Sequence, residues 1–246
     1  MRINVIGYGT VGKAQTFLLR RLGHEVSVFD PYLFPALKCL ERNVDFTFVC
    51  TPENAVEEVL QNLIKENVDG AYVIKSTVTV GTTEALMKKY GVHIAHNPEF
   101  LRENYANEDA VNPDRIIIGQ CCKEHSEKLV SLYAPMNKQI FVTDTTTSEA
   151  VKLLSNSYLA TLITFWNEAN ELAAKLGLNI DELAELVCAD SRMSVHGTAK
   201  FGEPFDGKCL PKDLRNLIQA YRGNGSNPIL FEAVEKLNEK LKRYQQ

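Results

Sequence analysis

The sequence predicts an α/β fold, with a doubly wound parallel sheet in the first part of the chain and an all-α domain with a long central helix in the second. Short β-branched runs alternate with amphipathic stretches over residues 1–144, as in consecutive βαβ units. From Thr146 to Leu176 the chain has neither proline nor glycine, which predicts one continuous helix. With 246 residues, 45% of them hydrophobic, it can bury a sizeable core.

The first part contains a series of strand candidates, each followed by turn residues. They lie at 3–7, 25–30, 45–52, 71–77 and 92–98, with two more at 115–119 and 139–143. Helical patterns at 53–66, 82–90 and 123–133 separate several of them. Parallel strands need crossover connections of this kind, so the order predicts right-handed βαβ units.

The second part is expected to be helical throughout. The stretch "TTTSEAVKLL" has Ser and Thr as candidate caps and Glu149 in the first turn of the long helix. Further helices are predicted at 180–188, 211–221 and 228–244. The predicted domains are therefore 1–144 and 145–246.

Composition excludes several classes of protein. The formal net charge is -4 and Lys and Arg form no dense cluster, so no nucleic-acid partner is expected. No apolar run reaches membrane-spanning length, and the first residues enter a strand directly, so neither a membrane span nor a signal peptide is expected.

The six cysteines show no CxxC spacing and no histidine at zinc-finger distance. They are typical of reduced thiols in a cytoplasmic protein, and no metal site is predicted. The neighbouring pair Cys121 and Cys122 is interpreted as packing at a strand end, with redox sensitivity as the alternative.

A glycine-rich turn predicts a dinucleotide site. Gly7, Gly9 and Gly12 form a GxGxxG pattern between the first strand and a helix, where they allow a tight turn, close approach of a pyrophosphate and close helix packing. Thr10 and Val11 belong to the same turn, and Asp30 ends the second strand. An acidic residue there accepts hydrogen bonds from ribose hydroxyls and repels a 2′-phosphate, which favours NAD over NADP. The alternative is that Asp30 only caps the strand.

Polar residues cluster at other predicted strand ends and on the long helix. Thr51 and Pro52 end one strand, Ser76 and Thr77 end another, and "HNPEFLREN" at 96–104 carries Glu99 and Glu103. Lys152 and Asn156 lie four positions apart, hence on one face of an otherwise apolar helix. A lysine there is expected to point into a polar site, unless it reaches water at the helix edge. His96 either lines that site or is structural.

Four stretches carry a resemblance to a known family. "NPEFLRE", "NPDRIIIG" at 112–119, "EAVKLLSNSYLATLITFWNE" at 149–168 and "KCLPKD" at 208–213 resemble the UDP-glucose/GDP-mannose dehydrogenase family in order and spacing. The resemblance covers nearly the whole chain. It implies a Rossmann-type NAD-binding domain and a sugar-nucleotide substrate whose alcohol is oxidised twice, to a carboxylate.

The resemblance also implies roles for individual residues. Cys209 matches the nucleophile that forms a thiohemiacetal and then a thioester, and Asp213 the carboxylate that assists it. Lys152 and Asn156 match the groups that hold the reacting oxygen. Glu99 matches the carboxylate near the hydrolytic water, and Thr77 matches the strand-end hydroxyl that can anchor it. The residues expected on the nicotinamide side are Ser76, Glu103 and Lys212.

Substrate binding is implied for a second set of residues. It comprises Glu99, Phe100, Leu101, Arg102, Lys152, Asn156, Arg192, Lys200, Phe205 and Gly207. The match at Arg192 is off by about one position. The long helix at 146–176 corresponds to the family's dimer interface, so a homodimer is expected.

Two departures from the family pattern stand out. The family's third domain, which binds the nucleotide, has no counterpart in the sequence and is expected to be absent. Pro204 and Asp206 replace glycines of the run before the cysteine, which is expected to change the substrate or weaken the site.

Three functions are compatible with these patterns. The first is the two-step, cysteine-dependent oxidation of a UDP-glucose-like sugar nucleotide, a step in nucleotide-sugar and polysaccharide metabolism. The second is a single-step 3-hydroxyacid-type NAD dehydrogenase, which shares the two domains and the Lys-xxx-Asn helix but lacks the cysteine. The third is a non-catalytic or impaired NAD-binding homologue.

Overall fold

The computed structural model describes residues 1–30 and 40–244. The chain divides into two compact units, Met1–Lys152 and Leu153–Gln246. The division falls inside the long helix α6 (Thr145–Leu176), a few residues beyond its start. Each unit is described by itself below.

Seven strands of the described residues form one sheet in the first unit. They are β1 (Arg2–Ile6), β2 (Glu25–Phe29), β3 (Phe46–Val49), β4 (Ala71–Ile74), β5 (Ile94–His96), β6 (Ile116–Gln120) and β7 (Ile140–Asp144). The order is β2-β1-β3-β4-β5-β6-β7. Ile3 of β1, the strand next to the edge strand β2, pairs with Val26 on one side and with Phe46 on the other.

The predicted parallel sheet is confirmed for β1 to β5, whereas β6 runs antiparallel to β5 and β7 follows β6. The reason lies in the connection between β5 and β6. It carries only the short turn η2 (Glu103–Tyr105) and the six-residue helix α4 (Ala106–Val111). Without a long crossover helix, the chain re-enters the sheet from the edge at which β5 ends.

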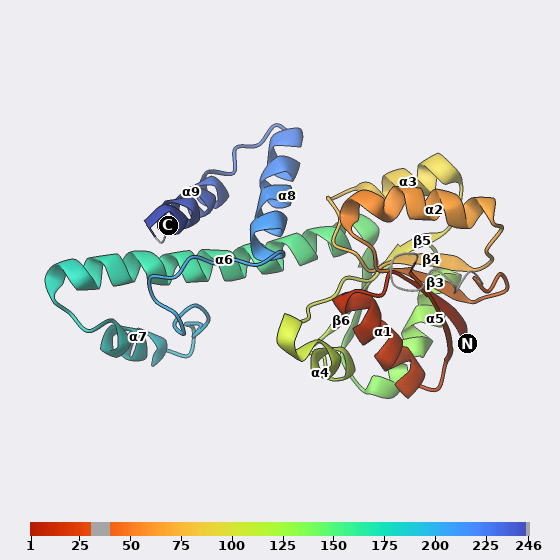
Figure 1. The fold of residues 1–246 in the computed structure, drawn as a ribbon, viewed down its shortest axis with the longest axis horizontal. Coiled ribbons are helices and arrows are strands. Elements are labelled where there is room, and N and C mark those ends of the chain that lie inside the picture. Colours follow the sequence, from red (N-terminus) through yellow and green to blue (C-terminus); the bar gives the residue numbers. More distant parts are fainter. Residues whose placement is uncertain (31–39, 245–246) are drawn as a thin grey trace. The chain divides into compact units, whose positions relative to one another are not determined.

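Helices cover both faces of this sheet (Figure 1). Figure 1 shows α2 (Val56–Lys65) and α3 (Thr82–Tyr90) on one side, and α1 (Thr10–Arg21), α4 and α5 (Lys123–Tyr133) on the other. The short turns η1 (Glu53–Ala55) and η3 (Ala134–Met136) precede α2 and follow α5.

Two separate buried cores reflect this doubly wound arrangement. Alternate strand residues supply each face, so Ile3 and Val5 join one core while Ile6 joins the other. Leu18 of α1 and Leu129 of α5 pack on the first face. The second face packs against α2 and α3. The parallel pairing of β1 to β5 places their carboxyl ends at one edge, where a ligand site is expected.

The second unit is helical. Beyond the start of α6 it contains α7 (Ile180–Cys188), α8 (Leu210–Gly223) and α9 (Ile229–Tyr244). Its small core joins Ala160 of α6 to Leu214 and Ile218 of α8 and to Val234 of α9. These helices agree with the predicted segments, and the fold class is confirmed.

The start of α6 differs from the prediction in one respect. Asp144, not a Ser or Thr, caps the helix by accepting from the Thr147 amide (2.7 Å) and the Thr147 hydroxyl (2.7 Å). Glu149 turns away to α3, where its carboxylate accepts from the amides of Gly81 (2.6 Å) and Thr83 (2.8 Å). A capping box needs its acid at the third helical position, and Glu149 lies two residues further on.

Within the described part of the chain, the cysteines are free thiols: Cys50, Cys121, Cys122, Cys188 and Cys209. The sixth, Cys39, lies outside the described residues. None of the helices that the structure describes is long and apolar enough to cross a membrane.

Candidate cofactor and catalytic site

The glycine turn after β1 has the geometry that a dinucleotide requires. Gly7 has φ +89°, and a Cβ at Gly12 would lie 1.8 Å from the Gly7 carbonyl oxygen. A Cβ at Gly9 would meet nothing within 4 Å among the described residues. Gly7 therefore makes the turn and Gly12 lets α1 pack on it, while the open side of Gly9 fits the approach of a pyrophosphate.

The first turn of α1 faces the same loop. Gly9 is its N-cap, and no side chain of the described residues caps it; Thr10 and Val11 follow on the surface. Helix N-terminal amides left without a side-chain cap are suited to bind phosphate oxygens. The residues present therefore fit an NAD pyrophosphate at this point.

Asp30 has a structural role in the first unit. Its Oδ2 accepts from the Tyr8 amide (2.7 Å), and the side chain is 9% exposed. The carboxylate thus holds the glycine loop in place from the end of β2. The contact of Asp30 with ribose hydroxyls stays a prediction.

The ends of β3 and β4 are joined by Ser76. Its hydroxyl donates to the carbonyls of Thr51 (2.6 Å) and Val49 (3.2 Å). Thr77 follows and is half-buried, while Pro52 is exposed at the start of η1. Ser76 thereby fixes the shape of the carboxyl edge, and Thr51, Pro52 and Thr77 lie along it.

A buried polar network that the sequence analysis missed lies beneath this edge. Lys75 donates to Asn97 Oδ1 (2.9 Å), which also accepts from the Tyr133 hydroxyl (2.6 Å), and Gln15 donates to that hydroxyl (3.0 Å). Burial lowers the pKa of Lys75 to about 8 and raises the pKa of the neighbouring Cys50 thiol to about 12. The signal in the sequence was a lysine directly after the apolar run "AYVI".

The NPEFL segment brings Glu99 to Lys152 within the first unit. Their Oε1 and Nζ atoms are 3.0 Å apart, and the two side chains are 10% and 4% exposed. Glu99 Oε2 accepts from the Leu101 amide (2.6 Å), and the Lys152 ammonium lies 5.3 Å from the Phe100 ring centroid. Lys152 therefore points into a polar site, and the alternative of a lysine at the helix edge is excluded.

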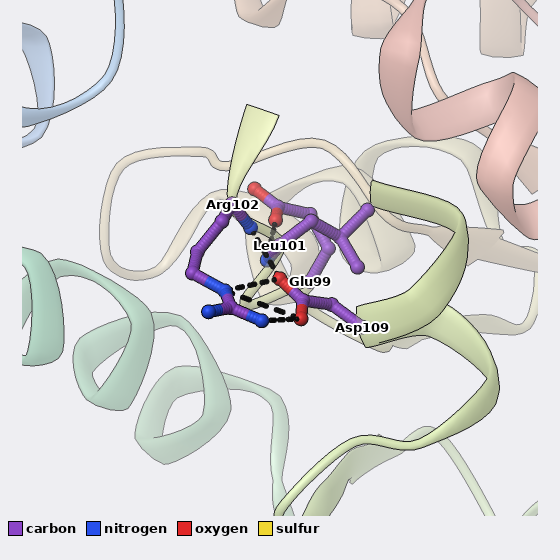
Figure 2. A network of polar contacts seen from close by, with 4 residues as sticks. All are labelled: Glu99, Leu101, Arg102 and Asp109. Atoms are coloured by element: carbon purple, nitrogen blue, oxygen red, sulfur yellow. Dashed lines mark hydrogen bonds and ion pairs between the residues drawn. The ribbon is translucent and has the colours of Figure 1, made fainter. Parts of the chain in front are cut away.

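Arg102 is tied down on the outer side of this segment. In Figure 2 the Arg102 guanidinium is hydrogen-bonded to the Asp109 carboxylate, and the closest contact is 2.6 Å. The hydrogen bond from the Leu101 amide to Glu99 lies beside this pair. The hydrogen bonds between Arg102 and Asp109 raise the pKa of Arg102 and lower the pKa of Asp109. Glu103 is exposed at the start of η2. The pair ties Arg102, three residues after Glu99, to helix α4.

A cavity of about 540 Å³ opens on this segment. Glu99, Phe100, Leu101 and Arg102 line it together with Lys75 and Asn97. The size is that of a small-molecule pocket. His96 is not part of it: the ring is fully buried and bonded to the Ser148 hydroxyl (2.8 Å), which confirms the structural interpretation.

The second unit carries the cysteine. Cys209 is exposed at the N-cap of α8, and its carbonyl accepts from the Asp213 amide (2.9 Å). The Asp213 carboxylate is buried; it accepts from Asn156 Nδ2 (2.6 Å) and pairs with Lys212 Nζ (2.8 Å). The sequence predicted Cys209, Asp213, Asn156 and Lys212 separately, and the structure brings Asn156, Asp213 and Lys212 into contact.

Two buried asparagines missed by the sequence analysis hold the segment that leads to Cys209. Asn167 of α6 donates to the Glu203 carbonyl (2.8 Å) and accepts from the Gly202 amide (2.8 Å). Asn238 of α9 donates to the Phe205 carbonyl (2.9 Å). The sequence signal that could have revealed them is an asparagine inside an apolar helix face, because a buried amide needs a hydrogen-bond partner.

Other predicted substrate residues have local partners. Arg192 and Lys200 are exposed and paired with Asp190 (2.5 Å) and Glu203 (3.1 Å). Phe205 is 4% exposed and packs in the core of the unit, so its side chain is a packing group. Gly207 has φ +80° with open space at its Cβ position, which suits a backbone that approaches a ligand.

Comparisons with known proteins bear on both units. Residues 37–137 match the sequence model of the UDP-glucose/GDP-mannose dehydrogenase family, NAD binding domain, and residues 146–240 match the central domain of that family. The chain belongs to this family. Its first unit is the NAD-binding domain, which confirms the predicted cofactor and the resemblance found in the sequence.

Curated relatives are longer than the chain. A UDP-glucose 6-dehydrogenase of Rickettsia typhi is 34% identical over 90% of this chain and 64% of its own length. The UDP-glucose 6-dehydrogenase YwqF of Bacillus subtilis is 30% identical over 97% of this chain and 66% of its length. The chain thus spans somewhat less than two thirds of these family members.

Solved structures agree on the fold. A UDP-glucose dehydrogenase of Pyrobaculum islandicum superimposes with a TM-score of 0.87 and 29% identity, covering 99% of this chain and 69% of that one. A Mycobacterium tuberculosis 3-hydroxyisobutyrate dehydrogenase gives 0.79 at 18% identity, covering 97% of this chain and 92% of that one. The latter likeness is one of fold alone.

Proposed function

We propose that this chain carries the cofactor and cysteine chemistry of an NAD-dependent dehydrogenase that oxidises the primary alcohol of a UDP-glucose-like sugar nucleotide to the carboxylate. The observation that supports it best is Cys209 at the N-terminus of α8, one turn before Asp213, in a chain of this family. A helix N-terminus favours the thiolate, which is the nucleophilic form. A single hydride transfer would not need a thiol in this position.

Bound NAD would supply the hydride acceptor for the reaction, and the first unit has residues that fit it. We assign the pyrophosphate to the amides of the glycine loop and the ribose hydroxyls to Asp30. The residues of the first unit assigned to the nicotinamide side are Thr51, Pro52, Ser76, Thr77 and Glu103.

We assign Lys152 to the oxygen of the reacting carbon. Its ammonium, already desolvated and paired with Glu99, would stabilise negative charge as it develops on that oxygen. Glu99 would orient the water for the last step. In the second unit, Asn156 fixes the orientation of Asp213, so that its carboxylate can take or return a proton.

The reaction would proceed through two covalent intermediates on Cys209. The first hydride transfer converts the alcohol to an aldehyde, and the thiolate adds to the aldehyde carbon to give a thiohemiacetal. Loss of a second hydride gives a thioester. Water attacks the thioester carbon, the C–S bond breaks, and the carboxylate and the thiol are released. Each substrate gives up two hydrides and three protons and consumes one water.

The test counts hydride transfers. The full chain is incubated with NAD and UDP-glucose, then with other sugar nucleotides, and NADH is measured per substrate consumed. Two NADH per substrate are expected, with a covalent adduct on Cys209 detectable by mass spectrometry. Cys209→Ser should abolish carboxylate formation, whereas Cys188→Ser, which changes a thiol of α7, should retain it.

Two other results would point elsewhere. One NADH per substrate, with activity that survives Cys209→Ser, would indicate single-step oxidation of the 3-hydroxyacid type. Tight NAD binding without turnover of any sugar nucleotide would indicate a non-catalytic homologue.

We also propose that the chain forms a homodimer through α6. Five large apolar side chains of this helix are between 44% and 61% exposed: Leu154, Tyr158, Phe165, Leu172 and Leu176. Their spacings of four and seven residues place them along one stripe of the helix. A second copy of the same helix is the partner that such a self-complementary stripe fits.

A further inference from the structure

Four side chains with nitrogen and sulfur donors converge in the first unit: His93, Cys121, Cys122 and His125. Each offers one donor atom, and these four atoms all lie within 4.8 Å of one another. The Cys122 and Cys121 sulfurs are 3.1 and 3.9 Å from His125 Nδ1. The His93 and His125 rings are 4.8 Å apart between centroids. None of these side chains takes part in the chemistry assigned above.

The cluster lies at the edge of the sheet opposite to the glycine loop. His93 directly precedes β5, and the two cysteines directly follow β6, which runs antiparallel to β5. Both therefore belong to the amino edge of the parallel strands. The cofactor residues lie at the carboxyl edge, so the cluster is separate from the cofactor site.

The backbone around the cluster is fixed by regular structure. The His93 carbonyl accepts from the Tyr72 amide (3.0 Å), Cys122 is the N-cap of α5, and His125 is in the first turn of that helix. The His125 ring stands edge-on to Phe46, 6.4 Å between centroids. The four donors are thus held by β5, β6 and α5, and not by a loose loop.

The separations fit a tetrahedral cation. With Zn–S of about 2.3 Å and Zn–N of about 2.0 Å, donor atoms of a tetrahedral site lie about 3.3–3.8 Å apart. The two sulfur–nitrogen distances, 3.1 and 3.9 Å, fall on either side of the value of about 3.5 Å expected for such a pair. Donor atoms of the cluster lie up to 4.8 Å apart, so side chains have to move closer by about 1 Å when the ion binds.

We propose that His93, Cys121, Cys122 and His125 form a binding site for a thiophilic divalent cation, with Zn²⁺ as the metal that the donor set favours. Two thiolates and two imidazoles are donors for Zn²⁺, while Mg²⁺ and Ca²⁺ need oxygen ligands. With four protein ligands the coordination shell is closed, so the site is structural and not catalytic. The exposed His93 provides the side from which the ion enters.

The sequence analysis predicted no metal site, and this proposal replaces that prediction. His93 lies far upstream of the Cys121–His125 segment, and adjacent cysteines do not resemble a zinc-finger spacing. Only the antiparallel pairing of β5 and β6 brings the two segments together. A bound ion would link β5, β6 and α5, so we expect it to stabilise the first unit.

The experiment uses the full chain without a histidine tag, reduced and freed of metal. Co²⁺ is added as an optical probe, and Zn²⁺ affinity is measured by competition with a chromophoric chelator. We expect one equivalent per chain, tetrahedral cobalt bands in the visible, thiolate charge-transfer absorption in the near ultraviolet, and a higher Tm with Zn²⁺. The double variant Cys121→Ser/Cys122→Ser should lose the charge-transfer absorption and saturable binding.

Two further variants guard against a folding defect. His93→Asn alters an exposed ligand and should weaken Zn²⁺ binding by more than about tenfold, the least that loss of even an outer partner costs, while the metal-free Tm stays unchanged. The matched control Cys188→Ser/His196→Asn removes one thiol and one imidazole of the second unit and should bind as the parent does. Cobalt spectra without thiolate bands, or equal affinity in parent and His93→Asn, would overturn the proposal.

Discussion

At the scale of single residues, the polar side chains assigned to catalysis are paired with one another inside each unit. Glu99 and Lys152 form a buried ion pair at 3.0 Å, and Asn156 holds Asp213 at 2.6 Å. Buried charges need such partners, and loss of one partner leaves the other uncompensated. Pairing also fixes the side-chain orientations before substrate binds, which is how a site is preorganised.

The glycine loop gives a prediction that separates folding from cofactor binding. Gly12→Ala places a Cβ 1.8 Å from the Gly7 carbonyl, so α1 must move and stability should fall by about 3 kcal/mol or more. Gly9→Ala meets no described atom within 4 Å, so its unfolding midpoint should stay close to that of the parent. Its NAD affinity should nevertheless fall about tenfold, or ~1.4 kcal/mol. Urea unfolding and NAD titration of both variants check this, and unchanged NAD affinity in Gly9→Ala would refute the pyrophosphate assignment.

His96 gives a prediction about pH. Burial lowers its pKa from 6.5 to about 3, so the folded protein keeps the ring neutral while the unfolded chain protonates below about pH 6.5. Stability from this group is full above that pH and is lost as the pH falls towards 3. The loss at pH 5 should be about 2 kcal/mol. Urea unfolding near pH 7.5 and pH 5 should show a smaller pH effect for His96→Asn than for the parent; equal effects would contradict it.

What the sequence could predict at this scale depends on how local the signal is. The glycine turn and Asp30 at the end of β2 could be predicted because their positions follow from spacing along one βαβ unit, and their contacts to the cofactor stay a prediction. Lys75, Asn167 and Asn238 were missed because their partners lie far along the chain, as in the bond between Asn238 and Phe205. Phe205 was assigned to substrate because position near Cys209 does not reveal which way a side chain points.

At the scale of elements, the sequence period predicted where helices and strands lie along the chain. It did not predict the direction in which a strand runs in the sheet. The helices at 82–90, 123–133 and 180–188 have the predicted bounds. The reversal of β6 could not be predicted, because a β-branched run is the same in either direction. The direction of β6 depends on the short connection through α4, and this helix was not predicted from the sequence.

The α3 helix owes its N-terminus to a residue from another element. Glu149 is fully buried, and its carboxylate bonds the amides of Gly81 and Thr83 and the Thr83 hydroxyl. Glu149→Gln puts an amide N–H against these donors and should lower stability by about 2–3 kcal/mol. Glu84→Gln, an exposed change in the first turn of the same helix, is the control and should leave the unfolding midpoint nearly unchanged. Equal effects of the two changes in urea unfolding would disprove the capping role.

At the scale of the whole molecule, the residues assigned to the cofactor and the cysteine fall in different units. The first holds the glycine loop, Asp30 and the Glu99–Lys152 pair, and the second holds Cys209 with the Asn156–Asp213 pair. The change from an alternating to an all-helical pattern was visible in the sequence because proline and glycine disappear at one place. The division inside α6, rather than before it, was not visible, because a helix shows no break where its packing partners change.

The exposed stripe of α6 gives the last prediction. Phe165 and Leu172 are 56% and 58% exposed, seven residues apart on one side of the helix, and burying such a stripe favours association. Light scattering after size exclusion should give twice the chain mass of 27.6 kDa. Phe165→Glu/Leu172→Glu should give a monomer with unchanged helical circular dichroism, since both side chains point to solvent. Phe17→Glu on α1, an exposed apolar position of the first unit, should remain dimeric. A monomeric parent at micromolar concentration, or a dimer that survives both glutamates, would show that α6 is not the interface.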